Sequence, residues 1–248
     1  MSDGRRLPAP PPLHRRQALF LDFDGTLVEI APAPGLIQVP AELPHLLGKL
    51  ADRLDGAVAV VSGRPLDELA HLLAPFAGGI AGDHGLERRY GDGNVSRCPA
   101  PPELAEARSV LAEFTARCDG VLLEDKGGSL ALHYRQAPAA RATCRTLVRR
   151  LALESSGAFD ALDGKMVIEL MPRSGGKGRV IADFLAGAPF HGRLPVFIGD
   201  DTTDEDGFAA VNRLGGISVH VGGGATIARH HLATVGDVWA WLGCGLAK

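Results

Sequence analysis

Short apolar runs alternate with helical patterns in the first and last parts of the chain. The runs occupy residues 18–21, 57–61, 80–86, 195–199 and 218–221, and continuous apolar runs of this length are typical of strands buried on both faces of a parallel sheet. Between them, apolar residues recur at helical spacing, as in Leu43, Leu46, Leu47 and Leu50, where Pro40 is expected in the first helical turn. Repeated strand–helix alternation predicts a parallel sheet with right-handed crossovers.

The pattern changes after Cys98, where several prolines interrupt the chain. We expect helices at 103–117 and 139–154, strands at 120–126, 129–135, 159–162 and 165–170, and a turn at Asp163-Gly164. This order of elements does not belong to a doubly wound sheet. The predicted fold class is therefore α/β, with a doubly wound parallel-sheet, Rossmann-like core (17–99 and 173–248), an inserted smaller α+β cap domain (100–172) and a flexible N-terminal tail (1–16).

Composition excludes several classes of protein. Of the 248 residues 46% are hydrophobic and 22% charged, as in ordinary globular chains. No apolar run approaches the roughly 18 residues of a membrane-spanning helix, and the net charge of −3 argues against nucleic-acid binding. The four cysteines are scattered and indicate reduced thiols in a cytoplasmic protein. These observations favour a small soluble substrate.

Acidic residues follow two of the predicted strands. Asp22 and Asp24 end the first strand, and Asp200 and Asp201 end the run at 195–199. An isolated Asp-x-Asp is usually a polar turn, but the carboxyl ends of parallel strands share one edge, where ligands bind. Two acidic strand ends there can share a cation, and oxygen ligands without a His or Cys cluster favour Mg²⁺. The pattern points toward phosphoryl transfer with an aspartate as nucleophile.

Two further residues suit a phosphate. Ser62 follows the second strand at a helix start, where its hydroxyl and free backbone N–H groups can bind an anion. Lys177 follows two glycines at another helix start and can neutralise phosphate charge. Taken singly, Ser62 is a helix cap and Lys177 a surface lysine. His230 and His231 are interpreted as surface histidines.

Together these segments resemble the four motifs of the haloacid dehalogenase-like phosphatases: Asp22-Phe23-Asp24-Gly25-Thr26, Ser62, Lys177, and Gly199-Asp200-Asp201 with Asp204. The resemblance implies that Asp22 attacks phosphorus and that Asp24 acts as acid and base. It also implies that Asp22, the Asp24 carbonyl and Asp200 hold Mg²⁺. Asp201 and Asp204 would support this metal site.

Alternation along the strands of the inserted module separates an apolar face from a charged one. We expect the apolar face on the two helices of the module. The open face then carries Glu124, Lys126, Arg135, Lys165 and Glu169. Alternation alone does not decide whether this face binds a ligand or is a solvated surface with neutralising pairs.

The segments 60–64, 84–87, 124–126, 129–135 and 167–170 resemble the trehalose-6-phosphate phosphatase family, and the likeness runs from Leu19 to Leu242. It implies Mg²⁺-dependent release of phosphate from trehalose 6-phosphate, with a trehalose-6-phosphate synthase as a candidate partner and the oligomeric state open. The implied substrate-binding residues are Gly63, Arg64, Glu124, Lys126, Arg135, Lys165 and Glu169. The alternatives are a phosphatase of sucrose phosphate, glucosylglycerol phosphate or a mannosyl-phosphoglycerate, and a non-catalytic regulatory subunit. Asp22, Asp24 and Lys177 are all present, which disfavours the last of these.

Overall fold

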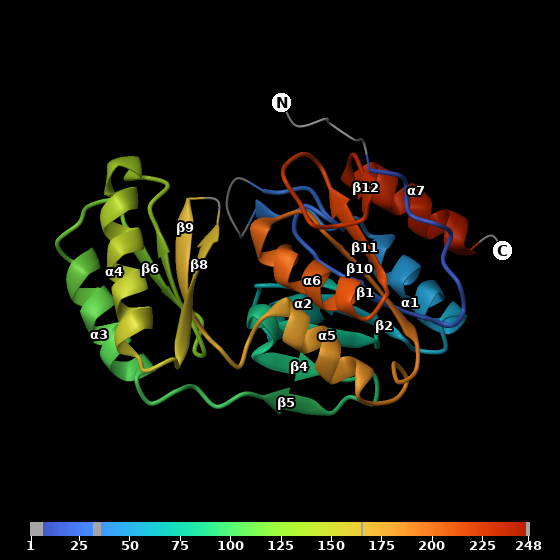
Figure 1. Cartoon of the computed structure of the whole chain (residues 1–248), viewed down its shortest axis with the longest axis horizontal. Helices are drawn as coiled ribbons and strands as arrows, with labels where there is room; N and C mark the ends of the chain where they lie inside the picture. Colours follow the sequence, from blue (N-terminus) through green and yellow to red (C-terminus); the bar gives the residue numbers. More distant parts are fainter. Residues whose placement is uncertain (1–6, 32–35, 165, 247–248) are drawn as a thin grey trace. The chain divides into compact units, whose positions relative to one another are not determined.

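The computed structural model describes residues 7–31, 36–164 and 166–246, which form two compact units (Figure 1). The core unit comprises the chain up to Ser96 and from Gly176 onward, and the inserted unit runs from Arg97 to Gly175. The expected limits of the cap, 100–172, lie just inside those of the inserted unit. The prediction for Lys165 lies outside the described residues.

Over its described residues, the core unit contains an eight-stranded sheet in the order β12-β11-β10-β1-β2-β3-β4-β5. Its strands are β1 (Gln17–Leu21), β2 (Val58–Val61), β3 (Gly79–Gly82), β4 (Glu87–Arg89), β5 (Val95–Arg97), β10 (Leu194–Gly199), β11 (Ile217–Val221) and β12 (His230–Leu232). From β12 to β3 every neighbouring pair is parallel, and β4 runs antiparallel to β3. The doubly wound α/β prediction is confirmed.

Helices cover both faces of this sheet (Figure 1). Residues of α1 (Leu43–Arg53), α2 (Leu66–Leu72) and α7 (Val235–Leu246) share one apolar cluster, and those of α5 (Lys177–Leu185) and α6 (Glu205–Arg213) share another. In β1, Leu19 and Leu21 face the first cluster and Phe20 the second. Each such side chain, fully buried, contributes roughly 1.5–3 kcal/mol. Burial on both faces explains why β1 reads as a continuous apolar run.

The strand order places β1 at the point where the sheet reverses direction. β10 lies on one side of β1 and β2 on the other, all three parallel. In an open α/β sheet, ligands bind beyond the carboxyl ends of the strands at this switch point. Asp22 follows β1, Ser62 follows β2 and Asp200 follows β10 directly. Topology alone therefore gathers three of the predicted site residues at one edge.

Three details of the core differ from the sequence-based expectations. Pro44, not Pro40, occupies the first turn of α1, whose N-cap is Glu42. β4, which runs antiparallel to β3, and then β5 extend the sheet after a 3₁₀ turn at Asp83–Gly85. β12 contains His230 and His231, and both residues are half-buried in the sheet rather than on the open surface.

The N-terminal segment packs on the core from residue 7 onward, so the prediction of a flexible tail over 1–16 is wrong for residues 7–16. The Leu13 side chain is buried beside Gly245 of α7. The Trp241 indole donates to the Pro11 carbonyl at 3.0 Å, and the His231 amide donates to the Pro8 carbonyl at 3.0 Å. Proline lacks an N–H group but keeps its carbonyl as an acceptor, and these carbonyls fix the segment.

The inserted unit is an antiparallel sheet covered by helices α3 (Leu104–Thr115) and α4 (Arg141–Glu154). Its strand order is β6-β7-β9-β8, formed by β6 (Leu122–Asp125), β7 (Leu130–His133), β8 (Phe159–Gly164) and β9 (Val167–Pro172). Leu132 and Ile168 pack with Leu111 and Val148 of the helices. The α+β prediction, with its apolar face on two helices, is confirmed.

The hairpin turn of β8 and β9 lies later than predicted. Asp163 pairs with Ile168 and Gly164 with Val167, so neither Asp163 nor Gly164 is a turn residue. The Asp163 carboxylate accepts bonds from Arg145 and Arg149 of α4 at 2.7 and 2.6 Å, which keep it on the helix-facing side of β8.

In the part of the chain that the structure describes, no helix combines the length and the apolar character needed to cross a membrane.

Candidate active site

Asp22 and Lys177 form a buried ion pair at the switch point of the core sheet. Asp22 follows β1, and Lys177 begins α5 after Gly176, whose φ of 110° lies in a region that favours glycine. The Lys177 Nζ lies 2.6 Å from the Asp22 Oδ1, and both side chains are nearly inaccessible to water. The structure thus joins two predicted site residues that are far apart in the sequence.

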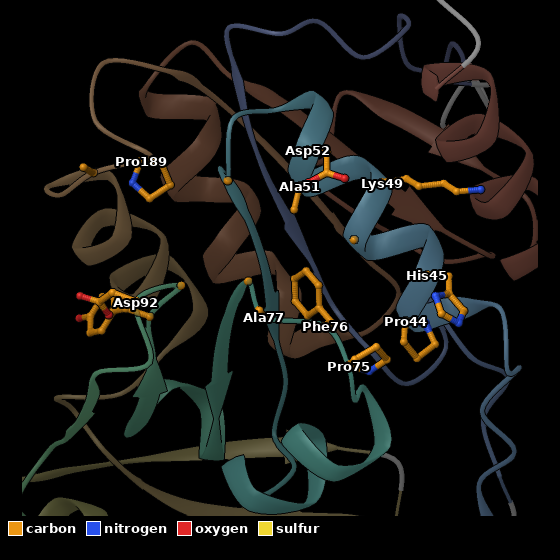
Figure 2. Close-up of a pocket in the computed structure, with 16 residues that line it drawn as sticks. Pro44, His45, Lys49, Ala51, Asp52, Pro75, Phe76, Ala77, Asp92 and Pro189 are labelled. Atoms are coloured by element: carbon orange, nitrogen blue, oxygen red, sulfur yellow. The ribbon is translucent and has the colours of Figure 1, made fainter.

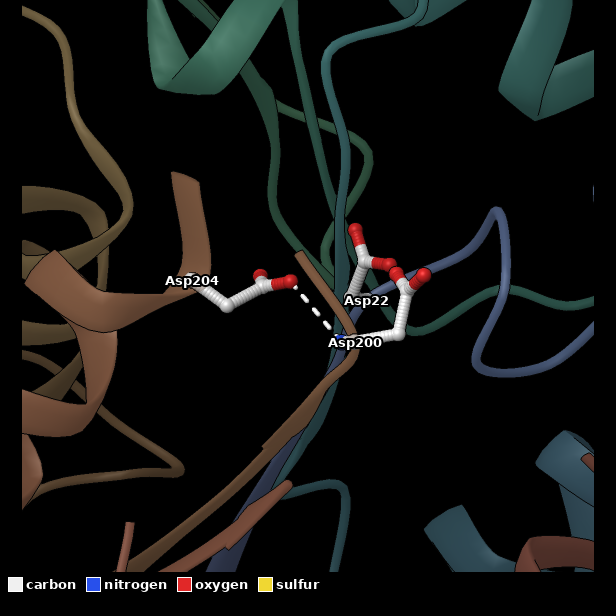
Figure 3. A group of neighbouring side chains, drawn as sticks. All are labelled: Asp22, Asp200 and Asp204. Carbon is white, nitrogen blue, oxygen red and sulfur yellow. Dashed lines mark hydrogen bonds between the residues drawn. The ribbon is translucent and has the colours of Figure 1, made fainter. Parts of the chain in front are cut away.

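Asp200 and Asp204 complete an acidic cluster with Asp22 (Figure 3). One carboxylate oxygen from each of the three lies within 4.8 Å of the others. Figure 3 shows the Asp22 and Asp200 carboxylates side by side, with Asp204 hydrogen-bonded to the Asp200 backbone nitrogen. The spacing suits a shared cation.

Asp204 connects the loop after β10 to Lys177 by hydrogen bonds. Its Oδ2 accepts the backbone N–H groups of Asp200 at 3.0 Å and Asp201 at 2.9 Å, and its Oδ1 accepts from Lys177 at 2.5 Å. With both oxygens occupied, Asp204 holds the loop after β10 in place. Asp201 points to local backbone instead, because its carboxylate accepts the Thr202 N–H at 2.7 Å in a capping box.

Gly25 is required where the loop after β1 passes Asp200. Its φ of 79° lies in the left-handed region, and a Cβ added there would stand 2.2 Å from the Asp200 Oδ2. A side chain at this position would displace the Asp200 carboxylate. Close packing against Asp200 therefore explains the glycine at position 25.

Charge in the cluster is unbalanced. Burial raises the pKa of Asp22 well above its usual value; Lys177 opposes this shift, and the Asp204 and Asp200 charges add to it. Burial by itself lowers the pKa of Lys177, but Asp204 and Asp22 outweigh it, so the pKa of Lys177 stands above its usual value. Lys177 is thus a fixed cation among more numerous carboxylates, and a divalent cation would compensate the excess negative charge.

The segment after β2 contacts Asp24 through Arg64. Ser62 is buried, and its Oγ accepts the Arg64 backbone N–H at 3.2 Å. The Arg64 guanidinium donates to both carboxylate oxygens of Asp24, from Nε at 2.7 Å and from Nη2 at 2.8 Å. Arg64 and Asp24 were predicted for different roles, and the structure pairs them.

Two residues near this pair, Glu68 and His84, were not among the predicted site residues. Glu68 of α2 accepts a hydrogen bond from the Arg64 Nη1, and the four-residue spacing within a helix start could have suggested the contact. His84 is buried with φ of 51°, and its imidazole lies so close to Gly63 that a Cβ on Gly63 would stand 2.5 Å from the His84 Nε2. Nothing in the local pattern signals that approach.

The predicted charged face of the inserted unit is present on its sheet. The Lys126 Nζ lies 2.8 Å from the Glu169 Oε1, with both side chains largely buried. The His133 Nε2 lies 2.7 Å from the Glu124 Oε2, and this hydrogen bond lowers the pKa of Glu124. Arg135 is exposed just beyond β7. The structure thus places four of the five predicted residues on or beside one sheet.

A separate hollow of about 1180 Å³ lies at the amino ends of β2 and β3, whereas the acidic cluster lies at the carboxyl ends of the strands (Figure 2). Gly56 and Gly78, which precede β2 and β3, line it together with Phe76, Pro75 and Pro189. None of the predicted site residues lines this hollow. It is therefore distinct from the acidic cluster.

Comparison with known proteins agrees with this geometry. The family model described as trehalose-phosphatase matches residues 20–234. The trehalose-6-phosphate phosphatase of Escherichia coli (strain K12) is 46% identical over 233 residues, covering 94% of this chain and 87% of the relative.

Two solved structures share the fold. The C-terminal domain of the Candida albicans trehalose-6-phosphate phosphatase has a TM-score of 0.83 at 20% identity, covering 99% of each chain. A haloacid dehalogenase-like hydrolase from Bacteroides thetaiotaomicron has a TM-score of 0.66 at 15% identity, covering 94% of this chain and 99% of that one.

The sheet and the inserted unit have the haloacid dehalogenase-like fold, and the family-model match and the 46% identical relative make this chain a phosphatase. Within that class, the chain belongs to the trehalose-phosphatase family.

Proposed function

We propose that this phosphatase hydrolyses trehalose 6-phosphate to trehalose and inorganic phosphate, in a Mg²⁺-dependent reaction with an aspartyl-phosphate intermediate at Asp22. The observation that carries the chemistry is the Asp22–Lys177 pair beside Asp200, at 2.6 Å from Oδ1 to Nζ. The substrate is supported by 46% identity to the relative named trehalose-6-phosphate phosphatase.

In the first step an Asp22 carboxylate oxygen attacks phosphorus. The bond between phosphorus and the sugar oxygen breaks, and Asp24 gives its proton to that oxygen, so trehalose leaves and an acyl phosphate remains on Asp22. Lys177 offsets negative charge at the phosphoryl group, and the Ser62 hydroxyl donates to one of its oxygens. Asp24 supplies the general acid because an alkoxide is a poor leaving group.

In the second step water attacks phosphorus of the acyl phosphate. Asp24, now a carboxylate, takes a proton from the water, and the bond between phosphorus and the Asp22 oxygen breaks. Phosphate leaves, and both aspartates return to their starting states. The net reaction consumes one ester and one water.

The donor set fits Mg²⁺. The ion would be held by hard oxygen ligands from Asp22, Asp200 and the Asp24 backbone carbonyl. Asp204 accepts hydrogen bonds from two backbone N–H groups and from Lys177, and through the Asp200 N–H it fixes the position of Asp200. When bound, the ion would offset negative charge on the phosphoryl oxygens.

Sugar recognition is assigned to the inserted unit. Carboxylates accept hydrogen bonds from hydroxyl groups, and Lys or Arg donates to their oxygens, so a face with Glu124, Lys126, Arg135 and Glu169 suits a polyol. Lys126 and Glu169 are already paired at 2.8 Å, which holds a donor and an acceptor in a defined arrangement.

The test is a substrate panel with purified protein and Mg²⁺, measuring phosphate release from trehalose 6-phosphate, sucrose phosphate, glucosylglycerol phosphate and a mannosyl-phosphoglycerate. We expect kcat/KM to be at least about tenfold higher for trehalose 6-phosphate, a difference of roughly 1.4 kcal/mol. Equal values across the panel would contradict the substrate assignment, and a higher value for another ester would replace it.

A further inference from the structure

Arg64 contacts Asp24, Glu68 and Phe23 in the core unit. Its guanidinium makes a two-point contact with Asp24, at 2.7 and 2.8 Å, and its Nη1 donates to Glu68. The guanidinium carbon also lies 5.8 Å from the centre of the Phe23 ring, within the range of a cation–π contact. The Arg64 side chain is only 11% exposed, so its position is well defined.

The contact between Arg64 and Asp24 conflicts with the role of Asp24 as the general acid. Both Asp24 oxygens accept from Arg64, so the carboxylate faces the guanidinium and each of its oxygens is already engaged. Hydrogen bonds between charged groups are stronger than those between neutral groups. Asp24 must therefore loosen this pair before it can protonate a leaving group.

Glu68 supplies the second acceptor that such an exchange needs. It lies in the first turn of α2, four residues after Arg64. When Asp24 turns away, Glu68 still offsets the charge of the largely buried guanidinium. Without Glu68, releasing Asp24 would remove the second of these two carboxylates from Arg64. Because the guanidinium is largely buried, losing both negative charges would destabilise the state in which Asp24 has turned away.

We propose that Glu68 is a positioning residue for the reaction: through Arg64 it sets how readily Asp24 turns toward the leaving oxygen. The inference rests on the proposed function, because it takes Asp24 as the group that protonates that oxygen. Glu68 contacts Arg64 and is assigned no contact with substrate.

The test separates esters that need a proton on the leaving group from those that do not. The leaving group of trehalose 6-phosphate is the alcohol trehalose, which needs a proton as it departs. The leaving group of p-nitrophenyl phosphate is a stable phenolate, which needs little acid assistance. kcat/KM reports only the steps up to departure of the leaving group. General acids contribute about 10²–10⁴-fold, so partial misplacement of Asp24 in Glu68→Gln should lower kcat/KM for the sugar ester about tenfold while the aryl ester changes less than about twofold.

Asp67→Asn is the matched control, since Asp67 is an exposed acid in the same helical turn. It should leave both esters within about twofold of wild type. Glu68→Asp keeps the charge and should recover part of the sugar-ester rate, which a purely structural defect would not predict. Circular dichroism checks that each variant is folded.

Parallel losses on both esters in Glu68→Gln would overturn the inference, and so would an unchanged sugar-ester rate or an equal effect of Asp67→Asn. Glucose 6-phosphate provides the same alkyl-to-aryl comparison if trehalose 6-phosphate is not the preferred ester, so an error in the substrate leaves the inference testable. A wild-type protein that releases phosphate from no ester would refute the proposed function and this inference together.

Discussion

Replacing Lys177 by Met should destabilise the core unit and do so more in the absence of a divalent cation. The Lys177 side chain is 3% exposed and contacts Asp22 at 2.6 Å and Asp204 at 2.5 Å. Methionine fills similar space but leaves two buried carboxylates without their cation. Breaking a buried pair in this way costs about 3–5 kcal/mol, a large share of the roughly 5–15 kcal/mol that stabilises a typical domain.

Urea unfolding followed by tryptophan fluorescence measures this change. The chain has two tryptophans, Trp239 and Trp241, both in α7 of the core unit, so the signal reports that unit. With chelator present we expect a loss of about 3–5 kcal/mol. Mg²⁺ stabilises both proteins by mass action, and the loss should shrink because the two freed carboxylates bind the cation more tightly in the variant than in wild type.

Lys49→Met provides the control, because Lys49 is an exposed lysine of α1. Its effect should stay within about 0.5 kcal/mol. A loss below about 1 kcal/mol for Lys177→Met in chelator would refute the account of the buried pair. An equal loss with and without Mg²⁺ would show that removing Lys177 does not strengthen cation binding, which contradicts the account of the freed carboxylates.

Three further predictions address the loop, the terminal helix and the inserted unit. Gly25→Ala forces a Cβ to 2.2 Å from the Asp200 Oδ2 at φ 79°, so Mg²⁺ titration of activity should show a higher concentration at half-maximal rate; an unchanged midpoint would argue against Asp200 as ligand. Trp239→Phe removes a 2.9 Å hydrogen bond to the Leu27 carbonyl and should cost about 1 kcal/mol in urea unfolding, whereas no loss would make that bond energetically neutral. Glu169→Gln should raise KM for trehalose 6-phosphate several-fold with little change for p-nitrophenyl phosphate, and a parallel change in both would count against sugar recognition by this face.

Much of the core fold could be predicted from the sequence because its strands are buried on both faces. β1 is apolar at every position that faces a helix layer, and such runs followed by helical spacing indicate a parallel sheet. The strands that escaped prediction are short and polar: β4 reads Glu-Arg-Arg, β5 reads Val-Ser-Arg and is exposed, and β12 reads His-His-Leu. Their pairing depends on neighbours already in place, which local pattern does not reveal.

The candidate site was predictable to the extent that it follows strand ends. Asp22 and Asp200 end neighbouring parallel strands, so their proximity follows from topology. The pairing of Arg64 with Asp24 does not, because a long side chain can reach several partners and its rotamer is decided by packing on Phe23 and by Glu68. The packing of the N-terminal segment escaped prediction for a similar reason: Trp241, whose indole donates to the Pro11 carbonyl, lies far away in the sequence.

The most direct test of the account is chemical trapping of the intermediate. Turnover of trehalose 6-phosphate by the wild-type protein with Mg²⁺ is quenched in acid and reduced with borohydride, which converts an aspartyl phosphate to homoserine. Peptide mass spectrometry should find homoserine at position 22, and neither Asp22→Asn nor protein without substrate should give it. Full turnover with no modified residue at position 22, or homoserine at Asp24 or Asp200 instead, would contradict the assignment of Asp22 as the nucleophile.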